Sequence, residues 1–228
     1  MDSGVAHSTS PFHTLDAFDG TRLATMMDVM DEIAAGDVEA WSAFLHQQPT
    51  LGKRLQEQGL TTPEEYSTIA WDDAMVLFTS CVEVTSEGRP LPLGDALTRE
   101  RFGRFPSQDG SPLNYFLEFI RPNLSVTEND GQSIYDTIIA SIRQLTLGCT
   151  EAYRGHDRYV NGFGGMRIHG YLSFDQVQEL RRNLASRAYT VSQDEPIDGG
   201  LADVAKHLTS LLKAAERRRV GIVYRSHG

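Results

Sequence analysis

Apolar residues recur at three- and four-residue spacing through most of the first 150 positions, which is the spacing of one face of an α-helix. The first such stripe predicts a helix that begins near Thr21 and ends at Gly36; its members are Leu23, Met26, Met27, Met30 and Ile33. Two short helices are expected next, one around Trp41 and one from Leu51 to Gln58. A further stripe predicts a helix that ends at Gly148; it consists of Ile134, Ile138, Ile142 and Leu145.

Local start signals refine this pattern. Residues 62–65 read Thr-Pro-Glu-Glu, with the N-cap threonine, the N1 proline and the N3 acid of a capping box, and they predict a helix that runs from Thr62 toward Val84. The dense apolar run from Leu113 to Ile120 fits either a helix or a buried strand, because it is too short to show a period.

From about residue 150, glycines recur among aromatic and aliphatic residues, and this pattern predicts shorter helices and strands. One or two strands are expected around a turn at Asn161-Gly162. Ser173 to Gln176 form a second capping box, which predicts another helix. An amphipathic helix from Leu201 to Ala215 and a terminal strand at Val220–Tyr224 follow. These elements predict an α+β fold that is helix-dominated, with a helical N-terminal part and a small C-terminal sheet packed by helices.

The same pattern suggests how the chain is organised. Residues 1–20 show little periodicity and are expected to form a flexible lead-in. Residues 21–150 form the helical part, and residues 151–228 form a smaller part of α/β texture. Because no long linker separates these two parts, we expect them to share one core.

Charge is unevenly distributed along the chain. The net charge is −10, but residues 1–150 carry 22 acidic and 9 basic side chains, whereas residues 151–228 carry 9 acidic and 12 basic ones. The acidic first part argues against a nucleic-acid binder, which needs clustered Lys and Arg, and it suits a basic protein partner. The only basic cluster is Arg217–Arg219, which is expected at a helix C-terminus.

The remaining composition indicates an intracellular protein. No segment approaches 18 consecutive apolar residues, and the N-terminus lacks the features of a secretory signal, so neither a membrane span nor export is expected. The two cysteines, Cys81 and Cys149, are too few for a disulfide framework and are expected to be free and buried. A cytoplasmic location follows by elimination.

Candidate chemistry gathers around the glycine-rich stretch from Gly155 to Gly170. His156, Asp157, His169 and Tyr171 flank it and could converge at one loop mouth, where the histidines would act as general acid and base or as metal ligands. No histidine or cysteine spacing matches a metal motif, and Asn161–Gly165 lacks the Lys-Ser/Thr of a phosphate loop, so no cofactor is predicted. The adjacent pair Asp72-Asp73 is expected on the solvated surface.

Residues 166–228 carry a short family-like pattern. Gly170-Tyr171-Leu172-Ser173 opens a helix through Val177, and the chain closes with an Ala/Leu-rich helix and the strand Val220–Val223. This order resembles the C-terminal part of a family of small, uncharacterised bacterial proteins, the YfbM-like group, in which an acidic residue stands where this chain has Gln176. The resemblance covers about a quarter of the chain. It implies an α+β fold, with helices against a small sheet, and it implies no catalytic residue.

Two functional hypotheses follow from these observations. The first is a non-enzymatic binding or regulatory protein that engages a basic protein partner through the acidic first part. The second is a small-molecule enzyme with its site in the loops around His156, Asp157 and His169.

Overall fold

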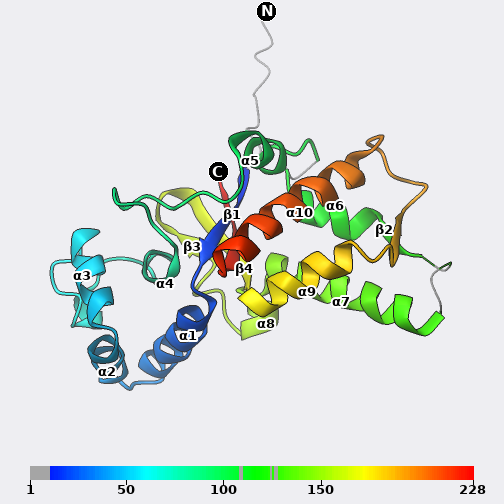
Figure 1. Ribbon diagram of the computed structural model, residues 1–228. Coiled ribbons are helices and arrows are strands. Elements are labelled where there is room, and N and C mark those ends of the chain that lie inside the picture. The colour runs from blue at the N-terminus through cyan, green and yellow to red at the C-terminus, as the bar shows by residue number, and fades with distance from the viewer. Residues whose placement is uncertain (1–10, 108–109, 124, 126–127) are drawn as a thin grey trace, which may run out of the picture.

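A four-stranded antiparallel sheet runs through the middle of the molecule (Figure 1). The computed structural model describes residues 11–107, 110–123, 125 and 128–228. The strand order is β1-β6-β4-β3, with β1 at Phe12–Phe18, β3 at Asn161–Gly162, β4 at Met166–Leu172 and β6 at Gly221–His227. Because β1 and β4 both run antiparallel to β6, these two strands end at the same end of the sheet.

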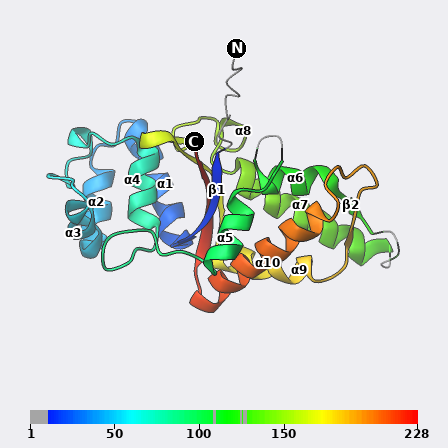
Figure 2. The same cartoon turned by 90° about the horizontal axis from the view of Figure 1, so that it is seen from above.

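Helices cover both faces of this sheet, as the view from above shows (Figure 2). The first layer consists of α1 (Gly20–Ala34), α2 (Ala40–Gln47), α3 (Pro49–Glu57) and α4 (Asp73–Cys81), with a 3-10 turn η1 at Tyr66–Thr68. The second layer consists of α5 (Ala96–Gly103), α6 (Pro112–Phe119), α7 (Glu128–Leu147), α9 (Phe174–Leu184) and α10 (Gly200–Arg218). The remaining elements are α8 (Glu151–Arg154), the turn η2 (Phe163–Gly165) and a two-stranded ladder of β2 (Ile120–Pro122) and β5 (Tyr189–Val191).

The central strand β6 is buried on both faces from Gly221 to Tyr224, and this explains why this part of its sequence is a continuous apolar run. Ile222 and Tyr224 belong to the hydrophobic cluster under the second layer, whereas Val223 belongs to the cluster under the first layer. Side chains alternate across a strand, so one strand supplies both clusters. Residues from before and after position 150 contribute to each cluster.

The structure confirms the α+β, helix-dominated fold. The apolar stripe after Thr21 is buried in α1, and the capping box at Ser173 has both of its hydrogen bonds. The ambiguous run from Leu113 is a helix, α6. Both cysteines are free and buried, as expected.

Three local expectations require correction. Residues 12–18, within the expected flexible lead-in, form strand β1. The sequence did not indicate this strand, because seven residues beside a polar N-terminus are too few to show clear alternation. Residues 1–10 lie outside the described part of the chain. The capping box at Thr62 opens no α-helix, and only η1 forms before α4, whose cap is Asp72. Asn161-Gly162 is strand β3, and the turn follows it at η2.

None of the helices in the described part of the chain combines the length and the apolar character that crossing a bilayer requires.

Candidate functional site

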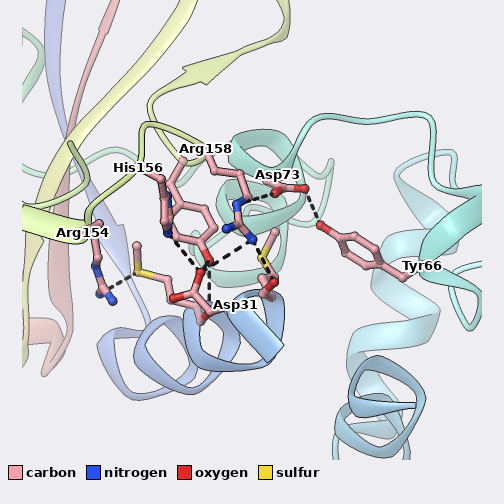
Figure 3. A network of polar contacts seen from close by, with 9 residues as sticks. Asp31, Tyr66, Asp73, Arg154, His156 and Arg158 are labelled. Atoms are coloured by element: carbon pink, nitrogen blue, oxygen red, sulfur yellow. Dashed lines mark hydrogen bonds and ion pairs between the residues drawn. The ribbon is translucent and has the colours of Figure 1, made fainter. Parts of the chain in front are cut away.

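His156 lies in a polar network that joins the loop after α8 to the first helical layer (Figure 3). Its Nε2 donates a hydrogen bond to Asp31 of α1 at 3.2 Å, and the same carboxylate oxygen accepts from the buried hydroxyl of Tyr159 at 2.6 Å. Burial raises the pKa of Tyr159, and the neighbouring Asp31 carboxylate raises it further, so this phenol stays protonated. The acidic partner of His156 is therefore Asp31 rather than Asp157.

Arg158 extends this network to α4. Its guanidinium donates to the carbonyl of Met30 at 3.1 Å and lies within 3.7 Å of Asp31 and 3.6 Å of Asp73. Asp73 also accepts from the hydroxyl of Tyr66. The expectation that Asp73 is solvated surface is thus wrong, because this carboxylate pairs with a cation from a distant loop. Arg158 holds α1 and α4 together.

Asp157 and Tyr171 have local partners of their own. Asp157 accepts from the backbone N–H of Glu151 at 2.6 Å, at the start of α8. The hydroxyl of Tyr171 accepts from Arg154 at 3.1 Å. Burial raises the pKa of Tyr171, an effect that Arg154 opposes.

His169 lies in a second, separate cluster. Its Nε2 is 2.9 Å from the hydroxyl of Ser226, and its ring lies 5.9 Å from that of His13 and 5.0 Å from that of Tyr224. Burial, together with the charges of His13 and Arg167, lowers the pKa of His169 to about 4, so the imidazole is neutral at pH 7.

The expected convergence of His156 and His169 is therefore wrong. Ile168 packs under the first layer, and strand alternation turns His169 to the opposite face, beside Tyr224. A β-bulge between Ile168 and Gly170 then returns Tyr171 to the first layer. A catalytic role for any one of the four predicted residues remains a prediction.

A cavity of about 550 Å³ lies at the end of the sheet where β1 and β4 finish and β6 begins. Because β1 leads directly into α1 and β4 into α9, the N-termini of these two helices meet there, and the C-terminal end of α10 lies beside them (Figure 1). Arg22 of α1, Arg54 of α3 and Arg219 at the end of α10 line the cavity.

Within the described part of the chain, Arg54 makes one hydrogen bond and has one buried nitrogen without a partner. One of its terminal nitrogens donates to the carbonyl of Val82, while its Nε is buried and has no hydrogen-bond partner. Burial lowers the pKa of Arg54, and the positive charge of nearby Arg22 lowers it further. A buried cationic donor without an acceptor is costly.

Three carboxylates line the cavity wall, and two of them pair with arginines. Asp19 accepts from the backbone N–H of Arg22 as the N-cap of α1 and lies 3.6 Å from the Arg22 guanidinium. Glu83 lies 3.8 Å from Arg218, which is outside the cavity lining. Asp175 is exposed in the first turn of α9. None of these carboxylates contacts Arg54 or Arg219 within the described residues.

Sequence reasoning missed this cavity because its three arginines are separated by 32 and 165 positions along the chain. The Arg217–Arg219 run does lie at the end of α10, as expected, and Arg219 caps that helix with a left-handed backbone (φ 58°). The sequence signal for this cavity would have been two strands, β1 and β4, each followed directly by a helix, because helix N-termini favour anions. In the described residues, no group of three or more His, Cys, Asp or Glu side chains is placed to hold a metal ion.

Comparisons of the chain with protein-family models, with curated proteins and with solved structures found no significant match. The resemblance of residues 166–228 to the YfbM-like family accordingly stays a prediction.

Proposed function

We propose that the protein binds a small anionic molecule in the arginine-lined cavity. The observation that carries this proposal is the gathering of Arg22, Arg54 and Arg219, which come from α1, α3 and the C-terminal end of α10, in the wall of one cavity. An anion placed there would offset the repulsion between the positive charges of Arg54 and Arg22.

The dimensions and position of the cavity support the same proposal. Its volume of about 550 Å³ lies within the range of small-molecule sites. The first-turn N–H groups of Gly20 and Phe174 precede any intrahelical hydrogen bond, and both residues line the cavity. Helix N-termini favour negative charge.

Calorimetric titration tests the proposal with three aromatic probes that differ in charge: phenyl phosphate, benzoate and neutral benzamide. We expect at least one anion to bind and benzamide not to bind. Arg54→Gln is expected to weaken the binding of that anion roughly tenfold or more, because a charge-assisted hydrogen bond is lost. The control is Arg89→Gln, which alters an exposed arginine outside the cavity lining.

Two results would contradict this proposal. One is that neither anion binds at millimolar concentration. The other is that Arg54→Gln binds the anion as tightly as Arg89→Gln does, since the site would then lie elsewhere. Unfolding curves of both variants establish that each one folds.

A second function is supported by the charge of the first helical layer. Residues 19–89, which contain α1 to α4, carry 13 acidic and 4 basic side chains, a net charge of −9. The exposed acids Glu32, Asp37 and Glu39 surround Val38, whose surface is 75% exposed. We propose this layer as the surface for a basic protein partner, in the cytoplasm, where two free thiols persist.

The test of this second function is a pull-down from lysate at low and high salt. A basic protein should be captured reproducibly and released as salt screens the charges. The triple variant Glu32→Gln, Asp37→Asn, Glu39→Gln should capture less of that protein. If the captured set is unaffected by both salt and the triple variant, this second proposal fails.

A further inference from the structure

We propose that the anionic ligand is a phosphomonoester whose phosphate group binds at the floor of the arginine-lined cavity, between Arg54 and the N-termini of α1 and α9. This inference rests on the proposed function and specifies its ligand class.

Donors reach the cavity from three separate segments of the chain. Gly20 and Thr21 open α1, Phe174 and Asp175 open α9, and Arg54 approaches from α3. In the first turn of α1, the side chain of the N-cap Asp19 accepts from the N–H of Arg22 and, among the described residues, from no other backbone N–H. In α9, the capping box engages the N–H groups of Ser173 and Gln176. It does not engage the N–H groups of Phe174 and Asp175, which lie between them.

This distribution of donors suits a tetrahedral anion better than a planar one. A phosphate monoester presents three oxygens in three directions, so each can accept from a different segment. A carboxylate presents two oxygens in one plane, which a single guanidinium satisfies. Two helix N-termini and a cationic side chain that converge from different sides therefore favour phosphate.

Close backbone approach brings the two N-termini together. A Cβ atom on Gly20 would lie 3.2 Å from the Cα of Ser173, and one on Gly221 would lie 2.5 Å from the carbonyl oxygen of Leu172. Side chains at these two positions would separate α1, α9 and β6. The glycines thus allow the first residues of both helices to line one cavity.

The remaining space accommodates the organic part of the ligand. The cavity is several times larger than a phosphate group, and its wall includes the partly exposed ring of Phe174 and the exposed Arg219. We therefore expect the ester group to extend from the floor toward Arg219.

The decisive experiment compares phenyl phosphate with benzoate on the full chain and on two variants of Phe174. Phe174→Ala removes the ring and keeps the backbone N–H. Phe174→Pro removes the ring and the N–H, and proline is compatible with the first helical position because Ser173 is extended. Inorganic phosphate serves as a third probe, since it lacks the ester group.

We expect phenyl phosphate to bind at least tenfold more tightly than benzoate. Phe174→Pro should bind phenyl phosphate about tenfold more weakly than Phe174→Ala, because only the proline variant lacks the N–H. Inorganic phosphate should show the same difference between the two variants, and circular dichroism should show that both fold.

The outcomes separate this inference from the proposed function. If benzoate binds as well as phenyl phosphate and depends on Arg54, the cavity is an anion site but the phosphomonoester is excluded. If the two Phe174 variants bind phenyl phosphate equally, the N-terminus of α9 takes no part and the inference is overturned. If no anion binds, the proposed function fails with it.

Discussion

The hydroxyl of Tyr159 is one of the contacts that connect the glycine-rich stretch to the first helical layer. The Tyr159 side chain is fully buried, and its hydroxyl contacts both the Asp31 carboxylate and the carbonyl of Met27 at 3.0 Å. We expect Tyr159→Phe to lower the free energy of unfolding by about 1–3 kcal/mol, because buried acceptors lose their donor. Urea denaturation measures this, with Tyr153→Phe, which alters a half-exposed tyrosine, as the control. An equal effect of both variants would show that the Asp31 network does not stabilise the fold.

A second residue, His169, links stability to pH. Its pKa is lowered to about 4 in the folded protein, below the ordinary value of 6.5, so between these values the unfolded chain binds the proton and the folded chain does not. The contribution of His169 to the free energy of unfolding is therefore fully present above pH 6.5 and is lost as the pH falls toward 4. At pH 4.5 the loss of unfolding free energy amounts to about 2–3 kcal/mol.

Replacement of this histidine isolates its contribution from those of other titrating groups. His169→Gln should flatten the fall in unfolding free energy between pH 6.5 and 4.5, whereas replacement of the exposed His46 by Gln should leave it unchanged. Urea denaturation at the two pH values decides the question. A pH dependence in His169→Gln identical to that of the unmodified protein would contradict the assignment.

At the scale of elements, the contact of β4 with α7 depends on a missing side chain. A Cβ atom on Gly170 would lie 2.0 Å from the carbonyl oxygen of Gln144 and 2.8 Å from that of Leu145. Gly170→Ala must therefore displace strand from helix, at a cost of about 2–3 kcal/mol of unfolding free energy. Gly52→Ala is the matched control, because no atom lies within 4 Å of its Cβ in α3, and it should be neutral or stabilising. Equal unfolding midpoints for the two variants would contradict the packing described.

Elements with strong local signals were predictable from the sequence, and those that depend on distant partners were not. The periodic apolar face of α1 and the capping box at Ser173 are properties of a few neighbouring residues. The strand β1 requires β6, about 200 positions away, for its hydrogen bonds. The box at Thr62 fails because Trp41 donates to the carbonyl of Pro63, which helps to hold that turn against the first layer.

The candidate site was even less predictable from the sequence, because it depends on residues that are far apart in the chain. The glycine-rich stretch indicates His156 as a candidate, but the partner of His156, Asp31, lies 125 positions earlier in the chain. The cavity depends on the antiparallel pairing of β6 with both β1 and β4, because this pairing alone places the two helix N-termini at one end of the sheet. Such pairing is a property of the fold and leaves no local motif.

For the whole molecule, the shared strand β6 predicts cooperative unfolding. Both tryptophans, Trp41 and Trp71, pack in the first layer, so their fluorescence reports that layer, whereas far-ultraviolet circular dichroism reports helices in both layers. Because β6 contributes to both hydrophobic clusters, the two urea transitions should coincide. A fluorescence transition at clearly lower urea would indicate that the first layer unfolds alone.

The central claim is that an anion binds where α1 and α9 begin, and amide NMR tests it most directly. The measurement is a titration of the ¹⁵N-labelled protein with phenyl phosphate. We expect the largest amide shift changes at Gly20, Thr21, Phe174 and Asp175, with no comparable changes in the loop around His156. Saturable changes centred on another part of the surface, or the absence of any saturable change, would contradict the claim.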